Sequence, residues 1–308
     1  MNDTTINILP PRLQRGDTIG IIAPAGPIRD REQFTAGIRL IREMGFEVKF
    51  DRDIYRREGY LAGTDEQRAN EFNTLWADPE VKALFAARGG YGSLRIATGI
   101  DMELIRRHPK ILVGFSDLTV LLCAAMQKAG LITFHGPTVS TLTDSDQYSA
   151  TRLFDTIASP RPPESIKPER LEIIASGNAL GRIVGGNLTN LCHLTGTPFE
   201  PDWRQAILFL EDIGETTYRV DRMLTHLAIA GKLAEISGLL LGDFTDCGDI
   251  EAIWQRALEL TGGNIPVWGN FPTGHGKQNF TMPMGLPAEM DSTERKVRFN
   301  TRCTTDPA

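Results

Sequence analysis

The sequence has few cysteines and no long apolar run. Of its 308 residues, four are cysteines, and they lie far apart without a C-x-x-C pair. This spacing predicts isolated thiols in a reducing compartment, neither a disulfide framework nor a zinc site. No apolar stretch approaches the ~18 residues that a membrane-spanning helix needs. We therefore expect neither a disulfide-stabilised protein nor one embedded in a membrane.

An excess of basic residues is also missing. The chain has 33 Lys and Arg against 39 Asp and Glu, for a net charge of −6. Nucleic acid and anionic membranes are therefore not expected as partners, because no basic excess exists to displace counterions. The first residues, "MNDTTINILPPRLQRGD", do not resemble a secretory signal, so a cytoplasmic location is expected. No metal-ligand spacing, P-loop or G-x-G-x-x-G is present, and no cofactor is expected.

What the first half does contain is a regular alternation of apolar strands and amphipathic helices. A capping signal at Asp30 predicts a helix to about Gly45, and another at Thr64 predicts one to about Ala77. Strands that alternate with helices predict right-handed crossovers and a parallel sheet covered on both faces. The expected strands cover residues 18–23, 46–50, 81–87, 111–115 and 132–136.

A change of composition divides the chain. "SPRPPESIKP" is rich in proline and charge, which is typical of a linker. We predict an N-terminal α/β domain over 1–143, a linker over 144–170 and a C-terminal domain over 171–308. The last forty residues look mostly β. The second half also contains helical patterns around Leu188–Leu194, Tyr218–Ala230 and Glu251–Leu260.

Two segments with possible chemistry follow strands of the predicted parallel sheet. "RGGYG" (88–92) follows one strand, and Ser116–Asp117 follows another. The carboxyl ends of parallel strands share one edge, so the two segments are expected to be neighbours. The N–H groups of Asp117 and a loop glycine, Gly89 or Gly90, could form an oxyanion hole around a nucleophilic Ser116. "GFSDL" lacks the second glycine of G-x-S-x-G, so Ser116 as a helix N-cap stays open as the alternative.

A nucleophilic serine needs a base, and five histidines are available. His275 lies between two glycines in "PTGHGKQNF", free to point into a cleft, although a surface loop histidine is an equal alternative. His135 ends a strand at the same sheet edge and suits a supporting role. His108 is expected to be exposed at a helix end. His193 and His226 fall in apolar helical segments and are expected to pack or cap there.

The base in turn needs an acid to hold it. "AILFLED" places Glu211 and Asp212 at the end of an apolar strand, where a carboxylate is rigidly positioned. The ordinary alternative is a cap or an ion pair with the arginines of "YRVDRMLTHL". Three acids suit that role better: Asp212, Glu215 and Asp221.

"VGGNLTNL" opens the second domain. Its glycines could form a backbone nest for an anion, or Asn187 could simply cap the following helix. We favour the cap, because the leucines that follow have the spacing of a helix packed on a core.

Seven segments together resemble the LD-carboxypeptidase family, which includes the muramoyltetrapeptide carboxypeptidases and their relatives that confer immunity to microcin C. The resemblance runs from about Gly16 to Gly285. The segments occur in the family's order: "GDTIGIIAPAGP", "ARGGYG", "VGFSDLT", "TFHGP", "GRIVGGNLTNL", "LFLEDIGETTYRVDRML" and "GHGKQNFTMPMG".

The resemblance implies a fold and a set of site residues. The fold is an N-terminal Rossmann-like α/β domain followed by a smaller, largely β domain. The catalytic triad of the family maps onto Ser116, Glu211 and His275. Its oxyanion donors map onto the N–H groups of Gly90 and Asp117.

The resemblance also implies a reaction. The usual member cleaves the bond between diaminopimelate and terminal D-Ala in cytoplasmic murein tetrapeptide, works without a metal and is a homodimer. A carboxypeptidase must hold a terminal carboxylate. Arg88 is the candidate by position, with a purely structural role as the equal alternative, and Gly89 and His135 are further candidates for substrate binding.

Other functions remain open. The microcin-type relatives cleave a peptidyl-nucleotide and need an aromatic platform, for which Trp203 is the nearest candidate, although "PDWRQ" reads as an exposed turn. An amidase on the same scaffold is a second alternative. A module that binds a nucleotide or sugar phosphate through "RGGYG" and the Ser116 helix is a third, but it leaves Glu211 and His275 without a role.

Overall fold

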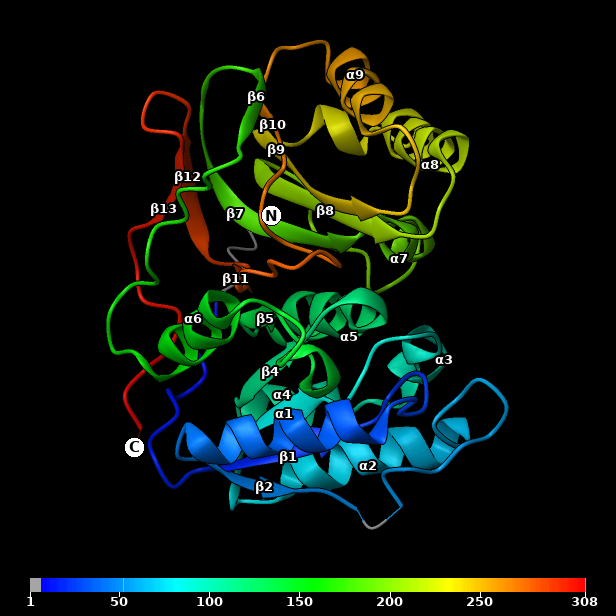
Figure 1. Ribbon diagram of the computed structural model, residues 1–308, viewed down its shortest axis with the longest axis vertical. Helices are drawn as coiled ribbons and strands as arrows, with labels where there is room; N and C mark the ends of the chain where they lie inside the picture. Colours follow the sequence, from blue (N-terminus) through cyan, green and yellow to red (C-terminus); the bar gives the residue numbers. More distant parts are fainter. Residues whose placement is uncertain (1–6, 52, 308) are drawn as a thin grey trace.

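Parallel strands from the first half of the chain, with one strand from near its end, form the lower sheet of the molecule (Figure 1). The computed structural model describes residues 7–51 and 53–307. The strand order is β11-β5-β4-β3-β1-β2, and only the β5–β11 pair is antiparallel. The strands are β1 Thr18–Ile22, β2 Glu47–Lys49, β3 Val81–Ala86, β4 Ile111–Gly114, β5 Thr133–His135 and β11 Met282–Met284.

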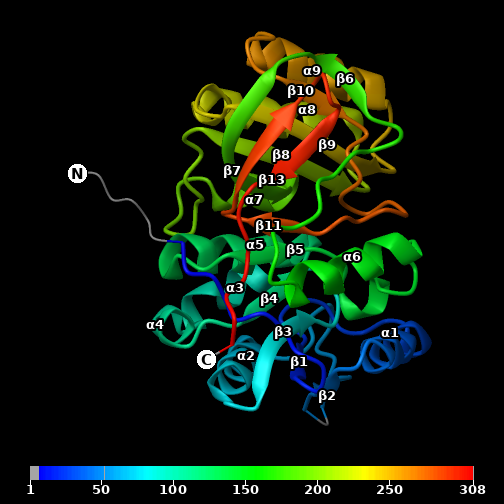
Figure 2. The ribbon, with the colours of Figure 1, turned by 90° about the vertical axis from the view of Figure 1, so that its left-hand side faces the viewer.

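Helices cover the lower sheet on both sides, as the alternation predicted. Figure 2 shows α1 and α6 on one side of the strands and α2 and α4 on the other. Asp30 caps α1 by accepting two backbone N–H groups, and Thr64 and Gln67 form a reciprocal capping box on α2. The side chain of Gln33 donates to Asp144, so the predicted box at α1 is only a cap. The helices are α1 Arg31–Glu43, α2 Asp65–Ala77, α3 Ser93–Ile96, α4 Met102–Arg107, α5 Thr119–Ala124 and α6 Gln147–Ala158.

The second half forms the upper sheet, with strand order β13-β12-β7-β8-β9-β10-β6. Strands β7 to β10 are mutually parallel, and the outer strands are antiparallel. Each of the predicted helical patterns is a helix, so this domain is richer in helix than a largely β domain. Its elements are β6 Glu172–Ala175, β7 Asn178–Asn187, α7 Leu188–Leu194, β8 Ala206–Ile213, α8 Thr217–Ile229, β9 Gly238–Thr245, α9 Ile250–Thr261, β10 Val267–Gly269, β12 Pro287–Asp291 and β13 Lys296–Phe299.

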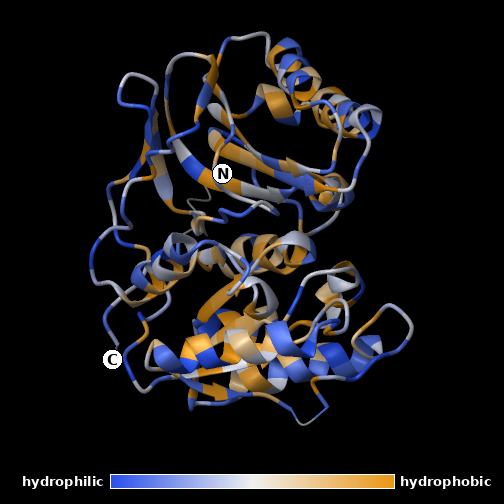
Figure 3. Cartoon of the chain, viewed as in Figure 1, coloured by the Kyte–Doolittle hydropathy of each residue, from blue (hydrophilic) through white to orange (hydrophobic). Residues whose placement is uncertain are grey.

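Apolar residues concentrate on the strands and on the helix faces turned toward them, and polar residues colour the outer face of α1 (Figure 3). Strand β4 is buried along its whole length, as is typical of a parallel strand covered on both faces. Within residues 7–51 and 53–307, none of the helices combines the length and apolarity that a membrane crossing requires.

The two sheets are tied together by segments that cross between them. Strand β11 comes from the C-terminal half but pairs with β5 in the lower sheet. The segment 144–170, predicted as a linker, contains α6, which buries Leu153, Phe154 and Ile157. The Phe154 ring stacks on Phe46, with ring centroids 5.5 Å apart. The proline and charged residues at the end of this segment are typical of a linker, so the amphipathic helix at its start was not predicted.

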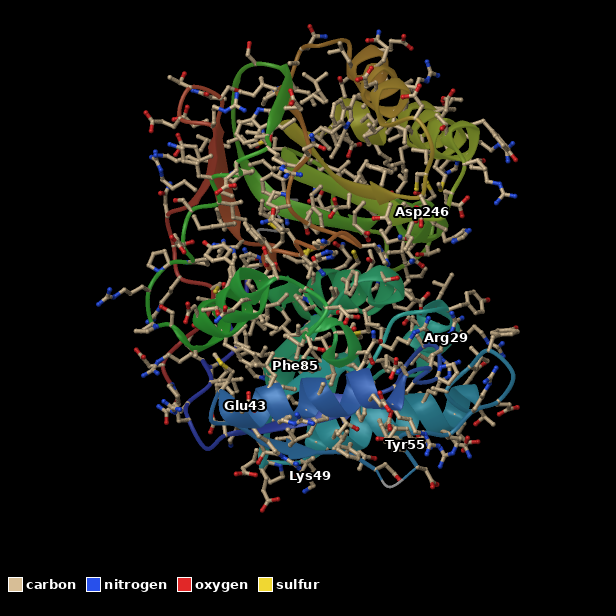
Figure 4. The ribbon with its side chains drawn as sticks, viewed as in Figure 1. Arg29, Glu43, Lys49, Tyr55, Phe85 and Asp246 are labelled. Carbon is tan, nitrogen blue, oxygen red and sulfur yellow. The ribbon has the colours of Figure 1, made fainter. Side chains whose placement is uncertain are left out.

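Truncating Phe154 should destabilise the protein strongly. Phe154 is 3% exposed and lies against Phe46 and Phe85, the latter labelled in the lower sheet in Figure 4. We expect Phe154→Ala to lower the free energy of unfolding by about 3–5 kcal/mol, because it leaves a cavity between α6 and the sheet. Urea denaturation measures this loss. Ile229→Ala, at a position 84% exposed, is the control and should change the value by less than about 0.5 kcal/mol. Equal effects of the two variants would contradict the packing described.

Candidate active site

Ser116 lies on a strained turn directly after β4. Its φ is +62°, a value that non-glycine residues rarely adopt and that costs about 1–3 kcal/mol. A short turn, Ser116–Leu118, then leads into α5. In the described part of the chain, Ser116 makes no side-chain capping bond, so its interpretation as a helix N-cap is wrong. A strained serine between a strand and a helix is the geometry of a nucleophile elbow.

The "RGGYG" loop lies against Ser116, as strand polarity predicted. Strands β3 and β4 are paired in parallel, and their ends bring the two loops together. A Cβ atom on Gly89 would lie 2.9 Å from Ser116 Cβ and 3.0 Å from its Oγ, so only glycine fits there. Gly90 has a φ of +118°, and the N–H of Gly26 donates to the Gly89 carbonyl over 3.1 Å. The loop after β1 therefore supports the glycine loop from behind.

Asp117 anchors the serine turn. Its carboxylate is buried and accepts the backbone N–H of Ser93 at 2.7 Å, which ties the turn to the start of α3. Burial raises the pKa of Asp117, and the hydrogen bond from Ser93 opposes that rise. The N–H of Gly90 has no acceptor among the described residues, and Gly90 directly follows Gly89, which lies against Ser116.

Glu211 and His275 meet in a short, buried contact. His275 Nδ1 lies 2.5 Å from Glu211 Oε2; the carboxylate side chain is 0% exposed and the imidazole 14%. Gly274, with φ of +121°, allows this approach, because a Cβ there would lie 2.7 Å from Glu211 Cβ. The structure thus pairs the loop histidine with Glu211 and not with its neighbour Asp212.

The contact with Glu211 shifts the pKa of the His275 imidazole. Burial by itself lowers the pKa of His275, but the charge of Glu211 and its hydrogen bond raise that pKa above the ordinary value overall. Burial raises the pKa of Glu211, and attraction to the imidazole opposes this. Because Nδ1 faces Glu211, Nε2 is the nitrogen left for substrate chemistry.

Ser116 and His275 come from different sheets. The ring of Phe115, the residue before Ser116, lies 4.8 Å from the His275 ring, centroid to centroid. No hydrogen bond joins Ser116 Oγ to the imidazole in the described part of the chain. Contacts of this kind often tighten only when substrate is bound. The geometry brings a strained serine, a polarised imidazole and the glycine loop together.

Asp212 has an ordinary structural role, as predicted. It accepts hydrogen bonds from Asn187 Nδ2 at 2.8 Å and from Thr189 N and Oγ1 at 2.9 and 2.8 Å. Thr189 lies in the first turn of α7, so Asp212 acts as a cap, one of its two predicted roles, and it forms no ion pair with the arginines of α8 among the described residues. Asn187 also caps α7 by accepting the N–H of Asn190, so the predicted cap is confirmed.

The acids of α8 behave as surface residues. Glu215 pairs with Arg219 at 3.4 Å, as predicted. Asp221 pairs instead with Arg256 on α9, at 2.7 Å, because α8 and α9 pack side by side.

Arg88 is a cation without a carboxylate partner among the described residues. It is half-buried, and burial lowers its pKa, with a further contribution from the charge of Arg29. Its Nη1 would lie 2.6 Å from a Cβ on Gly26, so the guanidinium stays close to the glycine loop. Figure 4 shows Arg29 at the right-hand edge of the lower domain, below Asp246 of the upper one. An unpaired arginine here suits an anionic group.

The other histidines have supporting or surface positions. His135 is 0% exposed, with its ring 4.9 Å from that of Phe209, which leaves no surface for the predicted direct contact with substrate. Burial lowers the pKa of His135 to about 3, so it is neutral. His108 is exposed at the end of α4, as predicted. His193 and His226 are exposed, not packed, because their helices turn leucines to the core.

Two further residues bear on the site. Asp243, on β9, accepts the N–H of Gly276 at 3.1 Å, and Asn279 accepts the N–H of Gly274 at the same distance. Both hold the loop that carries His275, and sequence reasoning missed them. Asp243 follows the apolar run "GLLLG" in the same way that Glu211 follows "AILFL", so the sequence pattern that pointed to Glu211 could also have pointed to Asp243.

Trp203 is 1% exposed and donates to Glu200, so the predicted exposed turn is wrong and the indole offers no platform for a nucleobase.

The described residues were also considered as metal ligands. The described residues contain no group of three or more His, Cys, Asp or Glu side chains able to hold a metal ion.

The fold and the site define a two-domain α/β protein with a histidine–glutamate pair beside a strained serine. Family models for the LD-carboxypeptidase N-terminal and C-terminal domains match residues 19–136 and 180–290. The chain belongs to the LD-carboxypeptidase family and is a peptidase by that membership.

Individual relatives agree. The chain is 38% identical over 303 residues to the "Probable murein peptide carboxypeptidase" of Bacillus subtilis (strain 168), covering 94% of each. The crystal structure of muramoyltetrapeptide carboxypeptidase from Oxalobacter formigenes superposes with a TM-score of 0.79 at 31% identity, over 90% of this chain and 97% of that one. The structure of MccF in complex with glutamyl sulfamoyl guanosine has a TM-score of 0.89 at 24% identity, over 96% and 99%, and shows the shared fold.

Removing the charge of Glu211 should change the pH dependence of hydrolysis. We expect His275 to act as a general base, which must be neutral, so kcat/KM should rise with pH through the pKa of His275, which Glu211 holds above its ordinary value. In Glu211→Gln, burial still lowers the pKa of His275, but the carboxylate charge that opposed this effect is gone. We expect the acidic limb to move to lower pH and kcat to fall by a factor on the order of 10⁴. pH–rate profiles measure both. Glu215→Gln, in the surface pair with Arg219, is the control, and an unshifted limb in Glu211→Gln would refute the pairing.

Proposed function

We propose that the protein is a serine LD-carboxypeptidase that removes the terminal D-Ala from murein tetrapeptide, with Ser116, His275 and Glu211 as its catalytic triad. One observation carries the proposal. The buried 2.5 Å pair of Glu211 and His275 lies beside the sheet edge where Ser116 has a φ of +62°. A purely binding protein has no use for a polarised imidazole next to a strained serine.

In the first half of the reaction, Ser116 Oγ attacks the carbonyl carbon of the penultimate residue. His275 Nε2 accepts the serine proton, and Glu211 holds the imidazole through Nδ1 and stabilises the imidazolium. The developing oxyanion accepts hydrogen bonds from the N–H groups of Gly90 and Asp117. Donors of this kind are each worth about 3–4 kcal/mol in the transition state.

In the second half, His275 gives its proton to the amine of the departing D-amino acid. Water then attacks the acyl-enzyme with His275 again as base, and Ser116 is regenerated. Arg88 holds the terminal carboxylate of the substrate. It is a cation beside the glycine loop, and it has no carboxylate partner among the described residues.

The choice of substrate draws on the relatives whose names refer to murein peptides, at 31–38% identity. We place the activity on murein peptides in the cytoplasm, and we expect a homodimer. The proposed reaction requires no cofactor.

The proposal is tested with murein tetrapeptide, with mass spectrometry to detect tripeptide and free D-Ala. The wild type should release D-Ala, and EDTA should not stop it. Ser116→Ala and His275→Ala should each lower kcat by a factor on the order of 10⁴ to 10⁶, since each removes a group that acts in the chemical step. Ser165→Ala, a serine of the loop before β6, is the matched control. Full activity in either triad variant would eliminate the assignment.

A second candidate, hydrolysis of a peptidyl-nucleotide, is favoured by one surface feature. Tyr60 and Tyr91 are 64% and 53% exposed, and their ring centroids lie 5.7 Å apart. Tyr91 directly follows Gly90 in the chain. Exposed aromatic rings can stack on a nucleobase.

Glutamyl sulfamoyl guanosine, the ligand of the MccF structure, serves as the comparison substrate. If the second candidate holds, kcat/KM on it should exceed that on murein tetrapeptide, and Tyr91→Ala should lower it ~10-fold or more without affecting the tetrapeptide. The reverse preference supports the murein proposal. Hydrolysis of a side-chain amide without D-Ala release would instead indicate an amidase.

A further inference from the structure

Arg68 is a buried cation near the start of α2, and the proposed reaction steps do not use it. Its side chain is 2% exposed, and its guanidinium donates to three backbone carbonyls. Nε donates to Gly63 at 3.2 Å, and Nη1 donates to Gly92 at 2.9 Å and to Pro24. Nη2 pairs with Asp65 at 2.5 Å. Every nitrogen of the guanidinium therefore has an acceptor, which offsets the cost of burying its charge.

The three carbonyls belong to three different loops at the sheet edge. Pro24 follows β1, Gly63 precedes α2, and Gly92 ends the glycine loop that follows β3. The loop after β1 in turn supports the glycine loop from behind. Gly92 must be glycine here, because its φ is +130° and a Cβ would lie 2.8 Å from Arg68 Nη1. Arg68 therefore fixes these loops relative to one another.

The peptide group between Gly92 and Ser93 is held from both sides. Its carbonyl accepts from Arg68 at 2.9 Å, and its N–H donates to the Asp117 carboxylate at 2.7 Å. A cation at the carbonyl and an anion at the N–H both match the dipole of a peptide group. Both charged side chains are buried, where hydrogen bonds are stronger than in water. This relay, formed by Arg68, the peptide group and Asp117, connects α2 to the residue after Ser116.

We infer that Arg68 is a positioning residue of the active site: through the relay it sets the spacing between the glycine loop and the turn at Ser116. The inference rests on the proposed function and extends it, because these two segments carry the N–H groups of Gly90 and Asp117 that are proposed to bind the oxyanion. Arg68 acts on the reaction only through the two loops. Its effect lies in the transition state, in which the oxyanion forms.

Arg68→Ala tests the position of the two donors, with murein tetrapeptide as substrate. We expect kcat to fall ~10²-fold, the loss typical of a displacement of about 1 Å, with KM changed less than ~3-fold. Arg95→Ala is the matched control and should keep the wild-type kcat. Arg95 pairs with the same carboxylate, Asp65, at 2.9 Å, and among the described residues its side chain donates only to that group.

Added guanidinium distinguishes positioning from a general loss of structure. The truncated side chain leaves space in which a free guanidinium ion can donate to the same carbonyls. It should raise the kcat of Arg68→Ala ~10-fold, and not fully to the wild-type value, because a free ion loses translational freedom on binding. Tetramethylammonium at the same concentration has no N–H donor and should restore nothing. If guanidinium also restores nothing, Arg68 only stabilises the fold and the inference is overturned.

Arg68→Lys keeps the test decisive where Arg68→Ala does not fold. It retains the charge, but a single ammonium group cannot donate along the fork of a guanidinium. We expect a loss of ~10-fold in kcat, the size of one or two hydrogen bonds from a charged group. Wild-type kcat in a folded Arg68→Lys would contradict the positioning role.

Asp117→Ala breaks the other side of the same peptide group and keeps the backbone N–H of residue 117. Because both side chains act through one peptide group, their effects should not be independent. The double variant Arg68→Ala/Asp117→Ala should lose at most ~3-fold more kcat than the more damaging single variant. Losses that multiply would show two independent effects and would overturn the relay.

The outcomes distinguish the two proposals. Release of D-Ala by the wild type, together with wild-type kcat in Arg68→Ala, would leave the carboxypeptidase proposal standing and overturn the inference. If the wild type cleaves glutamyl sulfamoyl guanosine and not the tetrapeptide, the proposed substrate is wrong, and the same loss of kcat in Arg68→Ala on that compound would support the inference. Cleavage of neither compound would overturn both.

Discussion

The contact between Glu211 and His275 is the constraint on which the site depends. A fully buried carboxylate is costly unless it is paired, and here the imidazole is its partner at 2.5 Å. The approach is possible only because Gly274 has no Cβ. Asn279 and Asp243 then hold the loop from two sides through the N–H groups of Gly274 and Gly276. The position of the imidazole is thus determined by packing and hydrogen bonds of the upper sheet.

Ser116 is held by the lower sheet, so its position relative to His275 depends on how the two sheets are joined. Strand β11 adds to the edge beside β5. Thr119, at the start of α5, accepts the N–H of Asn187 at the start of α7, at 3.0 Å. Asn187 in turn donates to Asp212, next to Glu211. A chain of short contacts therefore connects the serine turn to the strand that carries the acid.

Much of the fold was predictable because it depends on local patterns. Hydrophobic period and capping residues located α2 at Asp65–Ala77, and the apolar spacing after Asn187 located α7. Strand polarity predicted that "RGGYG" and Ser116 are neighbours, since parallel strands end at one edge. The failures have two causes. The burial of Trp203 and the partners of Asp212 depend on residues distant in sequence, whereas α6 was missed because its segment ends in proline and charged residues.

The sequence by itself determined the alternation of elements, the sheet edge that carries the serine and the residue types available for chemistry, because these follow from local spacing and polarity. It did not decide whether Ser116 is a helix cap or a nucleophile, or whether Glu211 or the adjacent Asp212 pairs with a histidine. Only the tertiary structure showed that Ser116 has a strained φ without a capping bond and that Glu211 is the carboxylate that meets His275. The positive φ of Ser116 comes from the turn that the surrounding sheet imposes, and one carboxylate meets His275 because successive side chains of a strand point to opposite faces.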